Sequence, residues 1–286
     1  MNSRSLLLHS ASPITVKSIL QFILAALLVV IAFGLDTDTY EARFNTISTK
    51  MASIRRSAPL IFNAKGKHTA TVIFLHGLGD SGAGWAQPAQ IMQGVKGRLD
   101  EVKWILPNAP NIPITLNMGM QMPGWWDIKS LGFKTTIDDE DAPGIQASQA
   151  YVHSLIQDEI SAGISSERII VGGFSQGGAL SLFAGLTAPV KLGGVIGLSS
   201  WLPLNKTFRD SLPESNPNKD TPVRMFHGDR DPVVRYEAGD ASQQKLKELG
   251  YDVTFNTYRG MEHSSCMDEL NDVEEFLFSR LPPTEK

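Results

Sequence analysis

Cysteine is almost absent from this sequence, since Cys266 is the only one among 286 residues. A single cysteine cannot form an internal disulfide, and this fits a reducing compartment. Neither sign of charge is in large excess, because 26 basic residues nearly balance 30 acidic ones and leave a net charge of −4. That balance argues against a nucleic-acid-binding surface. The sequence lacks clustered metal ligands and a phosphate-binding glycine loop, so we expect no metal and no cofactor.

Apolar segments alternate with helical ones along most of the chain. Several apolar segments are too uniformly hydrophobic to have one face in water, which predicts a buried, mostly parallel sheet. Alternating strands and helices predict one α/β domain with helices on both faces of the sheet and no large inserted lid domain. The predicted strands are residues 71–75, 102–106, 168–174, 194–199, 223–227 and 253–258, and the predicted helices are 144–162, 241–249 and 267–281.

Local signals set some of these boundaries. Asp240 and Gln243 resemble a capping pair for the helix at 241–249, and Gly250 is a stop signal. Proline and asparagine residues in 212–222 predict a surface loop.

Ser175 stands in a Gly-x-Ser-x-Gly sequence, between the apolar strand at 168–174 and a segment of small residues. This is the pattern of a nucleophile elbow, in which a serine sits on a sharp turn from strand to helix. Glycine is needed at Gly173 and Gly177 because larger side chains would collide with the neighbouring strand and helix. Ser175 is therefore the predicted nucleophile.

A nucleophilic serine needs a base, and in this architecture the base follows it near the C-terminus. Two histidines follow Ser175. His227 ends a strand and precedes the acidic loop, so it does not fit the usual order of serine, acid and base, and we interpret it as a packing residue. His263 lies in a loop between a strand and an amphipathic helix and is the predicted base. Cys266 is close by, but we expect a buried, small apolar residue there rather than a second nucleophile.

The acid that orients the base must come from the loop after the strand at 223–227. Asp229 and Asp231 compete for this role. Asp231 lies further past the strand end and is favoured, whereas Asp229 is predicted to hold the turn through its own backbone. The oxyanion would bind the N–H of Gln176 and that of Leu78, which lies between glycines after an early strand.

Seven segments with these motifs share their order and spacing with one enzyme family. They are FLHGLGD at 74–80, TLNM at 115–118, MPGWWDI at 122–128, GGFSQGGALS at 172–181, LPL at 202–204, HGDRDP at 227–232 and GMEHSSC at 260–266. From about residue 57 to 281 the chain resembles the acyl-protein thioesterases of the lysophospholipase and carboxylesterase group in the α/β-hydrolase superfamily. The resemblance implies the same nucleophile, acid, base and oxyanion amides as the residues alone.

The resemblance adds a substrate class. Such enzymes hydrolyse the thioester between a long fatty acyl chain and a protein cysteine, and many also cleave lysophospholipids or short esters. A fatty acyl chain needs an apolar groove, for which the candidates are Leu78, Met118, Trp125 and Val233. For Trp125 and its neighbour Trp126, loop packing is an equal alternative. S-acylated proteins are thus the expected partners, with a general carboxylesterase or lysophospholipase and a non-catalytic binding protein as alternatives.

The first fifty residues have a different character. Residues 18–35 carry no charge and would span about 27 Å as a helix, just under a hydrocarbon core. Basic residues precede this segment and acidic ones follow it, which would keep the N-terminus cytosolic and send the rest across a membrane. A cleaved signal peptide is the second interpretation.

A third interpretation begins the protein at Met51, immediately before the region of resemblance. Residues 51–286 would then form the catalytic domain, and residues 1–50 an alternative or non-native extension. This interpretation agrees with the cytoplasmic, and also nuclear, location that the resemblance implies. Membrane contact would then come through substrates rather than through residues 18–35.

Overall fold

The computed structural model describes residues 56–94, 97–130 and 140–284. The expectations for residues 1–50, including the apolar segment 18–35 and the start at Met51, lie outside these residues. Among the described residues, no helix is both long and apolar enough to span a membrane.

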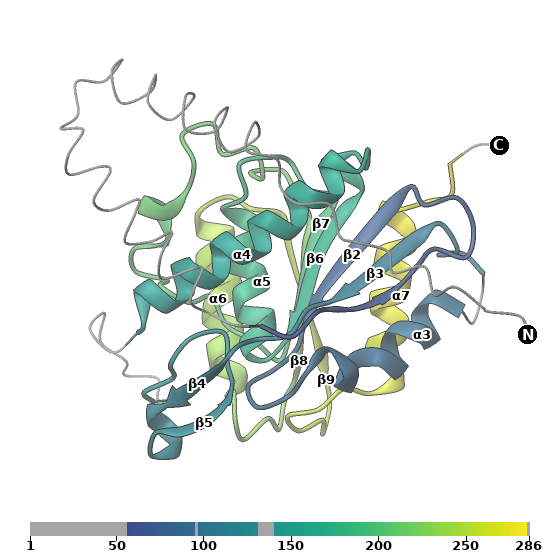
Figure 1. Ribbon diagram of the computed structural model, residues 1–286. Coiled ribbons are helices and arrows are strands. Elements are labelled where there is room, and N and C mark those ends of the chain that lie inside the picture. Colours follow the sequence, from purple (N-terminus) through teal and green to yellow (C-terminus); the bar gives the residue numbers. More distant parts are fainter. Residues whose placement is uncertain (1–55, 95–96, 131–139, 285–286) are drawn as a thin grey trace, which may run out of the picture. The chain divides into compact units, whose positions relative to one another are not determined.

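Seven strands of the described chain form one sheet (Figure 1). Their spatial order is β1-β3-β2-β6-β7-β8-β9, and every pairing is parallel except that of β1 with β3. The strands are β1 (Leu60–Phe62), β2 (Ala70–Leu75), β3 (Val102–Leu106), β6 (Ile169–Phe174), β7 (Gly194–Leu198), β8 (Val223–Gly228) and β9 (Val253–Tyr258). The buried, mostly parallel sheet predicted from the sequence is confirmed. The antiparallel edge strand β1 was not predicted.

Helices cover both faces of the sheet, as predicted (Figure 1). One face carries α4 (Ala142–Ser161), α5 (Gln176–Leu186) and α6 (Tyr236–Glu248), and the other carries α3 (Ala86–Gly94) and α7 (Met267–Arg280). Successive side chains of β2 point to opposite faces of the sheet. Ile73 belongs to the core under α4 to α6, whereas Phe74 belongs to the core under α3 and α7. This explains why most positions of β2 are apolar and why the strand shows no polar face.

Two predicted helix starts are corrected. Helix α4 begins at Ala142 rather than 144, because the Asp141 carboxylate accepts the Gly144 N–H at 3.0 Å and caps the first turn. Helix α6 begins at Tyr236 rather than 241, so Asp240 and Gln243 bond to each other within the helix instead of capping it. The extra turn is stabilised by packing of the Tyr236 ring against β9, a contact that no local pattern contains.

Other boundaries agree with the sequence. Gly250 follows α6 with φ of +79°, a backbone conformation that favours glycine, and stops the helix as predicted. The loop at 212–222 is irregular, but it is not wholly at the surface. Asn218 and Thr221 are buried, and Asn218 donates to the carbonyls of Ala188 and Val190.

A small second sheet was missed by the sequence analysis. Strands β4 (Asn111–Ile114) and β5 (Met120–Pro123) form an antiparallel hairpin that pairs only with itself among the described residues. Each strand contains a proline, which weakens any strand prediction. Within the described residues no large lid domain is present.

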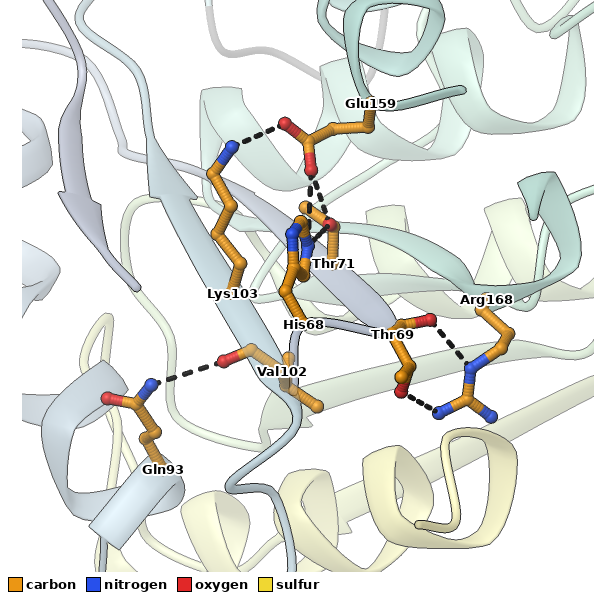
Figure 2. A network of polar contacts seen from close by, with 8 residues as sticks. All are labelled: His68, Thr69, Thr71, Gln93, Val102, Lys103, Glu159 and Arg168. Carbon is orange, nitrogen blue, oxygen red and sulfur yellow. Dashed lines mark hydrogen bonds and ion pairs between the residues drawn. The ribbon is translucent and has the colours of Figure 1, made fainter. Parts of the chain in front are cut away.

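A partly buried polar network joins α4 to the starts of two strands (Figure 2). The Glu159 carboxylate of α4 accepts from Lys103 Nζ of β3 and from Thr71 Oγ1 of β2, each at 2.6 Å. His68 Nε2 lies 2.9 Å from the same threonine oxygen. Because the threonine hydrogen is donated to Glu159, His68 donates its own N–H to that oxygen. The network fixes where α4 lies across the sheet.

The first turn of α7 buries a carboxyl group without compensation. Glu269 is fully buried, and neither of its oxygens has a hydrogen-bond partner among the described residues. Burial, with a smaller contribution from Asp272, raises its pKa from 4.5 to about 8. The folded state therefore holds this proton more tightly than the unfolded state does. Its contribution to stability is complete below pH 4.5 and is lost as the pH rises through about 8.

Replacing Glu269 with glutamine is expected to raise Tm at pH 8 to 9, because the side chain then stays neutral. The stabilisation should be on the order of 3 kcal/mol, less than the full shift implies because the helix N-terminus favours a negative charge. The difference should shrink toward zero as the pH falls to 4.5. Thermal unfolding between pH 4.5 and 9 measures it. Asp268→Asn, in the same turn but exposed, is the control, and an equal response in both variants would contradict the assignment.

Candidate active site

The turn between β6 and α5 carries Ser175 in a strained backbone, with φ of +54° and ψ of −123°. A β-carbon on Gly173 would lie 2.5 Å from the backbone of Gly177, and one on Gly177 would strike the carbonyls of Leu75 and His76. The collisions predicted for these two positions are therefore present. They leave glycine as the only residue that fits on either side of the serine.

Three of the predicted site residues form one chain of hydrogen bonds. Ser175 Oγ lies 2.9 Å from His263 Nε2, and His263 Nδ1 lies 2.7 Å from Asp231 Oδ2. A carboxylate can only accept, so Nδ1 carries the hydrogen and Nε2 is free to accept from the serine. The Phe174 ring packs on the imidazole with a centroid distance of 4.7 Å. The arrangement can remove the serine proton.

The two competing aspartates do different work. Asp231 Oδ1 accepts the N–H groups of Val233 and Val234, each at 2.9 Å, and its side chain is fully buried. Asp229 Oδ1 accepts the Gly260 N–H at 2.6 Å. The prediction that Asp229 holds its own turn was therefore wrong, because it ties the turn to the loop of His263. The bonds within the turn belong to Asp231.

The two predicted oxyanion amides belong to segments that follow two different strands, β2 for Leu78 and β6 for Gln176. Gln176 is the first residue of α5, where N–H groups have no acceptor within the helix. The Leu78 N–H has no acceptor among the described residues. Its loop passes close to the nucleophile, since a β-carbon on Gly77 would lie 3.3 Å from Ser175 Cβ. Gly79 N donates to Pro123 O at 2.8 Å and links this loop to the β4–β5 hairpin.

Sheet order explains why these loops meet. Four loops form the site, and each follows the carboxyl end of a parallel strand, namely β2, β6, β8 or β9. In that order they carry Leu78, Ser175, Asp231 and His263. Strand β2 lies between β3 and β6, so the chain order reverses at the β2–β6 pair. In an open α/β sheet, that switch point is where a crevice for ligands forms. Leu78 and Ser175 follow the two strands that define it.

The sequence of this chain is similar to those of known proteins along most of its length. A family model described as phospholipase/carboxylesterase matches residues 57–280. The chain belongs to this family. The acyl-protein thioesterase 1 of Gibberella zeae is 57% identical over 230 residues, which are 80% of this chain and 97% of that protein. The protein of the same name from Neurospora crassa is 54% identical over 81% of this chain and 95% of its own length.

Solved structures agree with the family. Acyl-protein thioesterase 2 of Zea mays is 31% identical, with a TM-score of 0.70 over 79% of this chain and 99% of that one. SOBER1 of Arabidopsis thaliana is 34% identical, with a TM-score of 0.68 over 74% of this chain and 99% of that one. The predicted α/β-hydrolase fold is confirmed for this phospholipase/carboxylesterase family member.

The apolar residues nominated for an acyl groove differ in exposure. Met118 at the hairpin turn is 96% exposed, Val233 after the acid is 40% exposed, and Leu78 is half-buried. Trp125 is only 2% exposed, and its Nε1 donates to His76 O at 2.8 Å. Of the two alternatives for Trp125, burial favours packing. Trp126 is similarly buried.

The supporting roles of two side chains were not predicted. The Gln176 side chain accepts from Trp125 N at 3.0 Å and donates to Trp126 O at 2.8 Å, so it ties the elbow to that loop. His76 donates Nδ1–H to Gly77 O and accepts the Ala109 N–H at Nε2, which fixes the start of the Leu78 loop. Burial lowers the His76 pKa and keeps the ring neutral. Only the positions of these residues beside Ser175 and Leu78 could have indicated such roles.

Two other expectations meet the structure differently. His227 is fully buried at the end of β8, as predicted for a packing residue. Cys266 is not a core residue, because it precedes α7 in an extended conformation and is only partly buried. Within the described ranges, no group of three or more histidine, cysteine, aspartate or glutamate residues is arranged to hold a metal ion.

Proposed function

We propose that this chain hydrolyses the thioester between a long-chain fatty acyl group and a protein cysteine, with Ser175 as the nucleophile. The hydrogen-bonded series Ser175, His263 and Asp231 carries the proposal. The names of the relatives supply the substrate class, because the proteins that align along nearly their whole length are called acyl-protein thioesterase 1.

Acylation begins when Ser175 Oγ attacks the acyl carbonyl carbon and its proton passes to His263 Nε2. Asp231 holds the imidazole with Nδ1–H toward itself and stabilises the imidazolium. The Leu78 and Gln176 N–H groups bind the negative oxygen of the tetrahedral intermediate. Collapse breaks the carbon–sulfur bond. The cysteine thiol leaves with the proton from His263, and the acyl group stays on Ser175.

Deacylation repeats these steps with water. His263 Nε2 takes a proton from a water molecule, whose oxygen attacks the acyl carbon. The bond to Ser175 Oγ then breaks, the serine regains its proton from His263, and the fatty acid leaves. Atoms balance over the cycle, in which one thioester and one water molecule give one thiol and one fatty acid.

The acyl chain would extend over Leu78, Met118 and Val233, with the buried Trp125 supporting this surface from below. Leu78 lies in the oxyanion loop, Met118 at the hairpin turn and Val233 just after the acid. Met118 and Val233 expose apolar surface in the folded chain, and covering such surface with an acyl chain is favourable. Acylated proteins would be the principal partners, and lysophospholipids would fit the same surface.

A general carboxylesterase or lysophospholipase is the second candidate, favoured by the phospholipase and carboxylesterase activities after which the family is named. It would use the same triad, so only substrate preference separates it from a thioesterase. The purified full-length protein should be assayed with an S-palmitoylated peptide, a lysophospholipid and short-chain esters. We expect kcat/KM to be highest for the peptide thioester. Higher values for the small esters would contradict the proposal.

We further propose that the enzyme acts in the cytoplasm, from a translation start at Met51. Support comes from the position of this methionine, six residues before the family match begins at residue 57. Mapping the N-terminal peptides of the protein purified from cells tests the proposal. Abundant peptides from residues 1–50 would favour the anchored or secreted alternatives instead.

A further inference from the structure

His227 lies beside the acid of the triad but takes no part in the hydrogen-bonded series. Its side chain is fully buried, and its Nε2 is 2.8 Å from Val234 O and 3.6 Å from Asp231 Oδ2. A carbonyl oxygen can only accept, so Nε2 carries a hydrogen. The other nitrogen, Nδ1, has no hydrogen-bond partner among the described residues.

The bond to Val234 bears directly on the acid. The Val234 N–H is one of two that Asp231 Oδ1 accepts, and the Val234 carbonyl is held by His227. Both polar groups of Val234 are thus used to keep the acid turn in place. The same Nε2 lies 3.6 Å from Asp231 Oδ2, the oxygen that binds His263.

Helix α6 is shaped to leave room for the His227 ring. Gly239 faces it, and a β-carbon there would lie 2.5 Å from Nδ1 and 3.0 Å from Cε1. Its conformation needs no glycine, since it lies inside a regular helix, where alanine is the better helix former. Space for the imidazole is therefore the reason that the structure offers for glycine at this position. The rings of Tyr236 and Phe255 close the other sides.

We propose that His227 is a positioning residue for Asp231, and that Gly239 is required because it admits the imidazole. The proposal rests on the proposed serine-hydrolase function. The ring acts as a neutral donor, because its second N–H would have no acceptor. Burial lowers the His227 pKa and outweighs the hydrogen bond to Val234 and the nearby Asp231 and Glu237, which raise it. His263 adds a smaller lowering.

The test variants separate the effect of the His227 hydrogen-bond donor from the effect of its side-chain volume. His227→Leu removes the donor and keeps a side chain of similar size, whereas His227→Gln places an amide donor near the position of Nε2. Gly239→Ala leaves His227 in the chain but displaces its ring. Tyr236→Phe is the control, because it keeps the ring contact and removes only an exposed hydrogen bond to Thr257.

Two measurements are needed for each variant, together with Tm to show that it folds. One is kcat and KM on a soluble short-chain ester, and the other is the rate at which a fluorophosphonate labels Ser175. A displaced acid weakens the base, and displacements of about 1 Å can cost 10²-fold in rate. We expect His227→Leu and Gly239→Ala to lower kcat and the labelling rate by 10- to 100-fold with KM within twofold. His227→Gln should recover most of the loss, and Tyr236→Phe should match wild type.

Wild-type rates in folded His227→Leu would overturn the inference, as would equal losses in His227→Leu and His227→Gln. If His227→Leu does not fold, Gly239→Ala decides, and wild-type labelling in that variant would overturn the inference. These results differ from failure of the proposed function, in which the wild-type protein itself would not be labelled.

Discussion

Replacing Ser175 with alanine is expected to lower kcat by about 10⁶-fold, which would leave no turnover detectable in an ordinary assay. The change removes the hydroxyl oxygen that lies 2.9 Å from His263 Nε2. It also leaves the fold intact, because the serine side chain makes no other hydrogen bond within the described chain. Turnover of a palmitoylated peptide and labelling by a fluorophosphonate measure the loss.

Ser200→Ala is the matched control for Ser175→Ala. The Ser200 hydroxyl is also buried but has no hydrogen-bond partner among the described residues, so its removal should leave kcat unchanged. If Ser175→Ala retained turnover, Ser175 would not be the nucleophile. If folded wild-type protein resisted labelling, the non-catalytic alternative would be favoured.

Replacing Asp231 with asparagine should lower kcat by about 10⁴-fold, more than a neutral isostere suggests at first sight. Val233 and Val234 both donate to Oδ1, so an asparagine at this position must keep its carbonyl oxygen there. Its NH₂ group then replaces Oδ2 opposite His263 Nδ1. Because the amide NH₂ can only donate, His263 Nδ1 must accept from it, and the imidazole hydrogen moves to Nε2. Nε2 then can no longer accept the proton of Ser175.

The comparison with Asp229→Asn makes this test specific. Asp229 accepts one N–H, from Gly260, and an asparagine oxygen can accept the same bond. We expect kcat of Asp229→Asn to stay within about tenfold of wild type, since exchanging a charged acceptor for a neutral one weakens a hydrogen bond by only about 1 kcal/mol, and tenfold corresponds to about 1.4 kcal/mol. Equal losses in the two variants would show that the acid turn, rather than the tautomer of His263, limits the rate.

Much of this site could be predicted because its key residues lie in short segments with local meaning. The turn around Ser175 requires glycines that are visible in the sequence, and the positions of Asp231 and His263 follow from the order of strands. Side-chain roles that depend on distant partners could not be predicted. Gln176 contacts a loop 50 residues away, and His227 depends on a glycine in the next helix.

The errors in the fold have the same origin. Helix α6 begins five residues early because Tyr236 packs against a strand that follows later in the chain. The strands of the β4–β5 hairpin are only four residues long, and their prolines argue against strands. In both cases tertiary contacts outweigh local preference.

The turn that carries the acid and the loop that carries the base are joined at several points. Asp229 binds Gly260, Arg230 N donates to Met261 O at 3.1 Å, and Asp231 binds His263. Three consecutive residues of one loop thus bind the other loop. A designer who transplants one of these loops from a relative must therefore move its partner with it. Over evolutionary time the two loops should likewise be inherited as one module, although about thirty residues separate them in the chain.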